Sequence, residues 1–151
     1  MTFQDIAILA EKRGFVVSQS EGVYRLRLKR TDGINVETSF VTDCKNKVGH
    51  FALPYSWEYI LKNDQTGEEL YRDWIEHYGE ETPAERMTNL QAEIYDFVNK
   101  VSRLEIRIHE YPVFTILGWK FGKIKELQFK TDSGWRDLWG SETNAAFQET
   151  H

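Results

Sequence analysis

The spacing of apolar residues at the start of the chain predicts one helix followed by strands. Apolar positions recur every three to four residues over 3–13, and Thr2 and Asp5 stand where a capping box forms. Gly14 follows directly and is a natural helix end. Apolar and polar residues then alternate with a period of two, which predicts strands over residues 15–18, 23–30, 34–41 and 48–53.

The next segment favours helix. Ser56 is placed to cap a short helix over residues 57–62, and Thr66 with Glu69 predicts a capping box for a second helix over 67–78. At about 100° per residue, the apolar side chains of this second helix share one side and most of its carboxylates share the other. We therefore expect an amphipathic helix that presents acid to solvent.

The clearest local signal is the run Thr82-Pro83-Ala84-Glu85. The threonine caps a helix, the proline takes the first helical position and the glutamate closes the capping box. The helix is expected to continue to about Ser102. Its buried stripe is expected to comprise Met87, Leu90, Ile94, Phe97, Val98 and Val101.

The last third of the chain returns to a period of two. Strands are expected over residues 104–109, 113–121, 124–130 and 135–139. A bulge is expected in the third of these, because Leu127 is out of phase with Ile124. The whole pattern predicts a single α+β domain over residues 1–151. It would have an N-terminal helix and two roughly four-stranded antiparallel sheets packed around a long central helix.

Negative charge is concentrated in residues 58–85. This stretch holds nine carboxylates and two cations, a local charge of −7, whereas the whole chain carries −5. The stretch is either an ordinary solvated surface or a docking surface for a basic protein. A calcium site is not indicated, because no Asp-x-Asp-x-Asp-Gly loop is present. The carboxylates expected to form this acidic patch are Asp64, Glu68, Glu69, Asp73, Glu76, Glu80 and Glu81.

A second candidate surface is the basic row, which we define as Arg25, Arg27 and Lys29, with Arg30 directly after it. These residues alternate along a predicted strand beside Tyr24. A cationic strand with an aromatic residue can hold single-stranded nucleic acid through phosphate pairing and base stacking. The row also fits the solvated face of a strand, or an edge protected from aggregation. The negative net charge argues against general nucleic-acid binding.

Catalytic chemistry is not indicated. No Gly-x-Gly-x-x-Gly, Walker-type or Gly-x-Ser-x-Gly motif is present. Cys44, the one cysteine, lies six residues before His50, but no orienting partner for a nucleophile accompanies this pair. His77, His109 and His151 lack the spacing of metal ligands. We therefore expect a protein that is not an enzyme and that needs no cofactor and no metal.

Aromatic residues make up 14% of the chain and include five tryptophans, so large side chains are expected to dominate the core. Trp57 and Trp74 lie in the acidic stretch, where an exposed tryptophan would make a good interface anchor. No segment reads as a signal peptide or approaches about 18 apolar residues, so we expect a cytoplasmic protein without membrane contact.

In size, acidity, aromatic content and lack of a catalytic motif, the chain resembles the immunity proteins of bacterial contact-dependent growth inhibition and related polymorphic toxin systems. Such proteins bind a cognate toxin domain, often a nuclease, and block its active site or an exosite. The resemblance implies a toxin domain as partner. Carboxylates on a rigid element would then complement the cationic cleft of that toxin, and electrostatic attraction would speed association.

The order of elements is also similar to that of the Whirly fold, in which two blocks of four strands are each followed by helix. Whirly proteins bind single-stranded DNA or RNA and carry a Lys-Gly-Lys-Ala-Ala-Leu motif. The nearest stretch here, Gly122-Lys123-Ile124-Lys125-Glu126-Leu127, is a poor match. The resemblance therefore implies the architecture and not the function.

Overall fold

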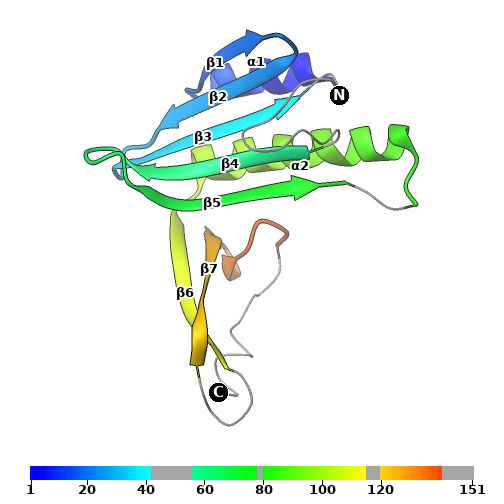
Figure 1. Ribbon diagram of the computed structural model, residues 1–151. Helices are drawn as coiled ribbons and strands as arrows, with labels where there is room; N and C mark the ends of the chain where they lie inside the picture. The colour runs from blue at the N-terminus through cyan, green and yellow to red at the C-terminus, as the bar shows by residue number, and fades with distance from the viewer. Residues whose placement is uncertain (42–55, 78–79, 115–119, 141–151) are drawn as a thin grey trace. The chain divides into compact units, whose positions relative to one another are not determined.

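The computed structural model describes residues 1–41, 56–77, 80–114 and 120–140, and its fold is α+β, as predicted (Figure 1). The elements in chain order are α1 (Phe3–Lys12), β1 (Val16–Ser20), β2 (Val23–Lys29), β3 (Ile34–Val41), β4 (Ser56–Asn63), β5 (Glu69–Glu76), α2 (Pro83–Arg103), β6 (Ile106–Phe114), β7 (Lys120–Thr131) and β8 (Gly134–Arg136). Contacts divide the chain into two compact units, Met1–Ser102 and Arg103–His151, and each is described by itself.

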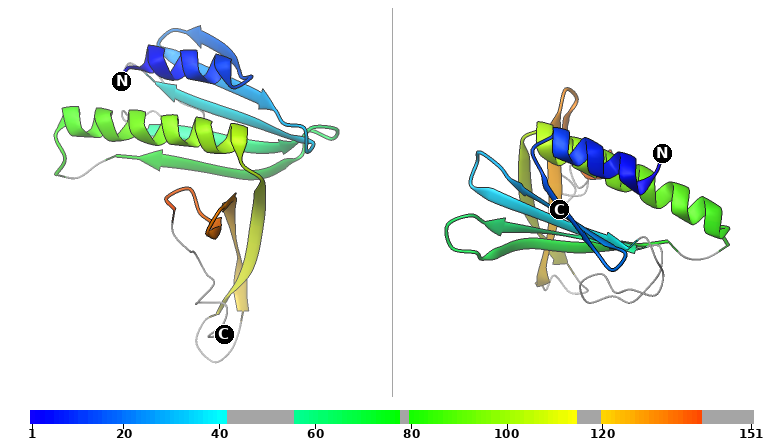
Figure 2. Two further views of the ribbon diagram at one scale, coloured as in Figure 1. Left: turned by 180° about the vertical axis from the view of Figure 1, so that it is seen from behind. Right: turned by 90° about the horizontal axis from the view of Figure 1, so that it is seen from above.

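The first unit is built on a five-stranded antiparallel sheet in which each strand pairs with the next along the chain, in the order β1-β2-β3-β4-β5. Both helices cover the same face of this sheet (Figure 2). Phe3 of α1 stacks on Phe40 of β3, with ring centroids 5.3 Å apart. Phe97 of α2 lies 5.2 Å from Trp57 and 4.7 Å from Tyr59 of β4. Neither helix covers the other face, which we call the open face.

The predicted N-terminal helix is confirmed as α1. The Thr2 side chain accepts a hydrogen bond from the backbone N–H of Asp5, and the Asp5 carboxylate accepts one from the backbone N–H of Thr2. This reciprocal pair satisfies backbone donors that the first turn of a helix leaves unpaired. Gly14 has a φ of +93°, a conformation that favours glycine, and it turns the chain toward β1.

The predicted long helix is confirmed as α2. The backbone N–H of Glu85 donates to the Thr82 hydroxyl at 3.2 Å, and Pro83 is the first helical residue. Five of the six residues expected in its stripe are fully buried, namely Leu90, Ile94, Phe97, Val98 and Val101. At the other end of the helix, the guanidinium of Arg30 donates to the carbonyl of Val101, which joins the β2–β3 turn to α2.

The helices predicted over residues 57–62 and 67–78 are wrong, because these segments contain the strands β4 (Ser56–Asn63) and β5 (Glu69–Glu76). Read with a period of two, β4 and β5 place alternate residues toward α2, and the described core includes Trp57, Tyr59 and Leu61. The Thr66 hydroxyl accepts from the N–H of Glu68 within a turn, and not from Glu69 as a capping box would require. Pairing with β3 thus outweighs the local helical signals.

The second unit contains a three-stranded antiparallel sheet in the order β6-β7-β8. The bulge predicted between Ile124 and Leu127 is wrong, because the pairing register with β6 is regular there. Leu127 is buried and Ile124 is exposed because they lie on opposite faces of β7. The register shifts instead between Pro112 and Phe114, where proline removes a donor from the ladder.

The strand counts differ from the expected four and four. The sheets hold five and three strands, because β4 and β5 replace two predicted helices and because four expected late strands appear as three described ones. The strand predicted over residues 48–53 lies outside the described residues. Within the described ranges, no helix is long and apolar enough to cross a membrane.

Candidate functional site

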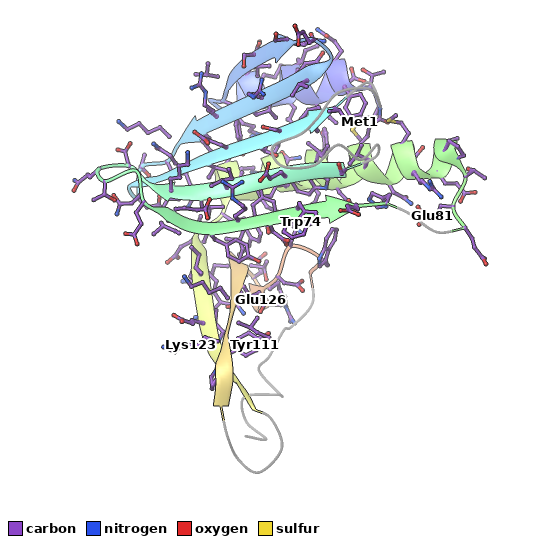
Figure 3. All side chains as sticks on the ribbon, viewed as in Figure 1. Met1, Trp74, Glu81, Tyr111, Lys123 and Glu126 are labelled. Carbon is purple, nitrogen blue, oxygen red and sulfur yellow. The ribbon has the colours of Figure 1, made fainter. Side chains whose placement is uncertain are left out.

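The residues of the predicted acidic patch do not share one helix face. Asp64, Glu68 and Glu69 lie at the β4–β5 turn and the start of β5, whereas Glu76 ends that strand. Glu80 and Glu81 follow β5 and precede α2, and Figure 3 labels Glu81. A strand of eight residues separates the two groups by about 23 Å. The patch is therefore two acidic groups at opposite ends of the outer strand.

Part of this acidic charge is neutralised within the chain. The ion pairs are Asp64 with Lys29 at 3.3 Å, Glu69 with Arg72 at 2.7 Å, and Glu81 with His77 at 3.7 Å when that imidazole is protonated. The side chain of Glu76 instead accepts a hydrogen bond from the indole of Trp74, at 3.1 Å. The carboxylate of Glu76 therefore has no described cation within 4 Å. It lies at the C-terminal end of β5, which we call the α2-proximal end because the chain continues from there to α2.

Trp74 is the residue of this strand that sequence reasoning singled out as a possible anchor. Its side chain is 46% exposed and projects from β5 (Figure 3). The hydrogen bond to Glu76 holds the indole beside a carboxylate. In the part of the chain that the structure describes, β5 pairs only with β4, so it forms the outer edge of the five-stranded sheet. A large aromatic side chain, a carboxylate and a strand edge thus coincide.

Asp73 lies on the other side of β5, in the row that faces α2, opposite Tyr59. Burial raises the pKa of its carboxyl above the ordinary value of 3.8, and the hydrogen bond from the Trp74 backbone N–H, at 2.8 Å, lowers that pKa in part. Because the carboxylate form is disfavoured in the folded state, Asp73 lowers the stability of the folded protein at neutral pH. It is also a poor member of an acidic docking surface.

We expect Asp73→Asn to stabilise the protein at pH 7, by less than about 1 kcal/mol in the free energy of unfolding. A raised folded-state pKa means that the contribution of Asp73 is fully favourable below the unfolded pKa and is lost as pH rises through the folded pKa. The gain should therefore disappear at about pH 2.5, where both proteins are neutral at this position. Thermal unfolding of the variant and the unsubstituted protein at the two pH values measures this difference in stability.

The matched control for this prediction is Asp96→Asn, which removes an exposed carboxylate paired with Lys100 at 2.7 Å. No gain is expected for that variant at pH 7, because it loses an ion pair and relieves no burial. A stabilisation of Asp73→Asn that persisted unchanged at low pH would contradict the burial argument.

The open face holds a buried ion pair that sequence reasoning missed. Glu58 of β4 is only 4% exposed, and its carboxylate accepts from the guanidinium of Arg72 on β5 at 2.5 Å. Arg72 also donates to Glu69. The hydrogen bond that Arg72 donates to Glu69, together with the negative charge of Glu58, raises the pKa of Arg72 above its ordinary value. The period-two alternation of residues 56–63 is the signal that could have placed Glu58 on this face.

The basic row lies on the open face, as its alternation predicted, and Tyr24 lies on the opposite face. Tyr24 is buried, stacks on Phe40 with centroids 5.3 Å apart, and donates its hydroxyl to Gln4 at 3.4 Å. Its ring therefore cannot stack on a base bound over Arg25 or Arg27. Lys29 is paired with Asp64, so its charge is partly compensated.

A hollow of about 480 Å³ lies on the open face. Its lining includes Arg25, Arg27, Glu37, Ser39, Glu58 and Arg72. A second hollow of about 340 Å³ shares Arg27 and Glu37 with the first. The first hollow also has Leu26 and Ile60 in its lining, so charged and hydroxyl groups stand beside apolar ones.

The remaining candidate groups that the structure describes do not converge on a catalytic or metal centre. His77 lies 2.7 Å from Glu93, and His109 stacks against Tyr111. Cys44, His50 and His151 lie outside the described residues. Among the residues that are described, no group of three or more His, Cys, Asp or Glu side chains is placed to hold a metal ion. No family of known proteins, no curated protein and no solved structure matches the chain.

Proposed function

We propose that the chain is an immunity-type protein that binds a basic toxin domain and neutralises it, using the outer strand β5 and the acidic residues at its α2-proximal end. The observation that carries this proposal is the exposed indole of Trp74 beside Glu76 on an edge strand. In this assignment the docking surface comprises Trp74, Glu76, Glu80 and Glu81. The protein acts by binding, in the cytoplasm, and has no catalytic role.

Burial of the tryptophan would supply most of the affinity. Tryptophan is enriched among the few residues that dominate binding energy, and such anchors sit at the centre of an interface with a polar rim. Trp74 offers such an anchor, and its indole N–H donates to the carboxylate of Glu76. The hydrogen bond also limits the rotamers of the side chain, which lowers the entropic cost of docking.

The acid near Trp74 would select a cationic partner. Glu76 and Glu80 have no ion pair with a described cation, so they can pair with lysines or arginines of a toxin. Attraction of this kind raises the rate of association more than it raises affinity. Rapid capture is what protection from an incoming toxin requires.

The experiment is a pull-down of tagged protein from its native cells, with the retained protein and nucleic acid both identified. We expect a stoichiometric basic protein. Trp74→Ala should weaken its binding about 30-fold or more, and Glu76→Lys combined with Glu80→Lys should slow association about tenfold at low salt. The matched control is Glu11→Lys with Glu21→Lys, an equal charge reversal on α1 and in the β1–β2 turn.

A second arm tests neutralisation itself. The captured protein is expressed alone and together with this chain, and growth is compared. Toxicity that the chain relieves, and that Trp74→Ala restores, would support the immunity assignment. Capture of a harmless partner would contradict it, and equal weakening by the control variant would contradict the assignment to β5.

The second candidate function is binding of single-stranded nucleic acid by the basic row. It is favoured by the absence of any ion pair for Arg25 and Arg27 within the described ranges. The burial of Tyr24 weighs against it, because it removes a stacking platform, and the ion pair of Lys29 with Asp64 reduces the charge available for phosphate. We therefore place this function second.

A further inference from the structure

Two cross-strand rows on the open face bring together groups that are far apart in the sequence. One row runs Ser18, Arg25, Ser39, Glu58 and Trp74 from β1 to β5, and the neighbouring row runs Val16, Arg27, Glu37, Ile60 and Arg72. The first hollow lies over the middle of these rows, since most of their members line it. Trp74 ends the first row but does not line the hollow, and neither do the carboxylates of the β5 docking surface proposed above.

Arg25 and Arg27 are the unused cations of this hollow. Neither forms a hydrogen bond or an ion pair with any residue in the described ranges. They lie on the same face of β2, two residues apart, so their Cα atoms are separated by about 7 Å. Two guanidinium groups at this spacing can converge on one oxyanion, and each can bind it with two parallel hydrogen bonds.

Hydroxyl donors flank the first arginine. Ser18 and Ser39 are the direct cross-strand neighbours of Arg25, on β1 and β3 respectively. Both line the hollow, and neither hydroxyl has a hydrogen-bond partner among the described residues. A hydroxyl can donate to a phosphate or carboxylate oxygen and so complete the coordination that the guanidinium begins.

The carboxylates of the hollow are already engaged, which leaves the two arginines available. Glu37 is opposite Arg27 in the register but lies 3.2 Å from Lys62, its partner in an ion pair. Glu58 is buried against Arg72 at the far side of the hollow. The two arginines of β2 thus have no ion-pair partner in the described part of the chain, whereas the carboxylates of Glu37 on β3 and Glu58 on β4 each have one.

We propose that the open face of the five-stranded sheet carries a binding site for a small polar ligand with a phosphate or carboxylate group, which Arg25 and Arg27 bind and the hydroxyls of Ser18 and Ser39 orient. The volume of about 480 Å³ falls in the range of small-molecule sites. The two guanidinium groups in its lining favour an anionic molecule. The cations without a described ion pair lie on β2, at one side of the hollow, so the ligand carries its oxyanion at one end.

The test is titration of the whole protein, at low ionic strength, with inorganic phosphate, pyrophosphate and citrate, followed by backbone amide NMR. Saturable shifts are expected at residues 18, 25, 27 and 39, with a dissociation constant of about 1 mM or tighter for at least one probe. A stronger response to pyrophosphate identifies a phosphate ligand, and a stronger response to citrate identifies a carboxylate ligand.

Arg25→Gln and Arg27→Gln should each weaken this binding at least about tenfold, since each removes a charge-assisted contact. Both side chains are exposed, so the amide spectrum should show an intact fold. The matched control, Lys12→Gln, removes one positive charge from α1 and should leave binding unchanged.

Three results would overturn the proposal. The first is the absence of saturable binding by all three probes up to about 10 mM. The second is equal weakening by Lys12→Gln, which would mean general attraction of anions to the protein. The third is tight binding of a single-stranded oligonucleotide, steeply dependent on salt, that none of the small anions displaces. This last result would instead assign the arginines to nucleic acid.

Discussion

Replacing Phe97 with alanine is expected to lower the free energy of unfolding by about 3–5 kcal/mol. Phe97 is fully buried between α2 and the sheet, and its ring lies 5.2 Å from Trp57 and 4.7 Å from Tyr59. The variant loses the transfer free energy of a phenyl ring, leaves a cavity and breaks two aromatic contacts. Urea unfolding followed by circular dichroism measures the change.

The control is Tyr95→Ala, two residues earlier on the same helix. Tyr95 is exposed, so its truncation should change the free energy of unfolding by no more than about 0.5 kcal/mol. The loss at Phe97 is a large fraction of the total stability of a domain of this size. Similar costs for the two variants would contradict the packing of α2 on β4.

Removing the guanidinium in Arg72→Met is expected to cost about 2–4 kcal/mol, because Glu58 would keep a buried charge without a partner. The cost comes mainly from the unpaired carboxylate and less from the attraction that is lost. The double variant Arg72→Met with Glu58→Leu should therefore recover most of the stability, since it leaves no buried charge. Unfolding of the four proteins forms a double-mutant cycle.

Lys62→Met provides the comparison, because its ion pair with Glu37 on the same face is about one-third exposed at both ends. That variant should lose less than about 1 kcal/mol. Additive losses in the Arg72 and Glu58 variants would show that the pair is not coupled. In that case the ion pair would not be what holds Glu58 and Arg72 in place in the lining of the first hollow.

Local interactions explain which elements could be predicted. The capping box of α1 joins residues three positions apart, and the start of α2 depends on a threonine and a proline that are adjacent in the chain. Alternation alone placed Arg25 and Arg27 on one face of β2 and Leu26 on the other. These features need no knowledge of the rest of the fold, because the interacting groups are neighbours in sequence.

The segment from Ser56 to Glu76 shows where local signals fail. Its helix-like spacing and its threonine cap are real features of the sequence, but the same residues also alternate with a period of two. Pairing with β3 buries Trp57, Tyr59 and Leu61 under α2, and that burial outweighs the small differences in intrinsic propensity. Because residues 69–76 form a strand, the carboxylates of the predicted patch lie mainly in two groups, one at each end of β5.

The sequence by itself determined the α+β class, both helices with their caps, the hairpin of β2 and β3, and the concentration of carboxylates before α2. Only the tertiary structure decided that β5 is an outer strand exposing Trp74, and that Arg25 lies between Ser18 and Ser39. The physical reason is that strand register joins residues as many as 29 positions apart, as Ile34 and Asn63 are. A shift by one residue would move every side chain to the other face, and no local pattern specifies that pairing.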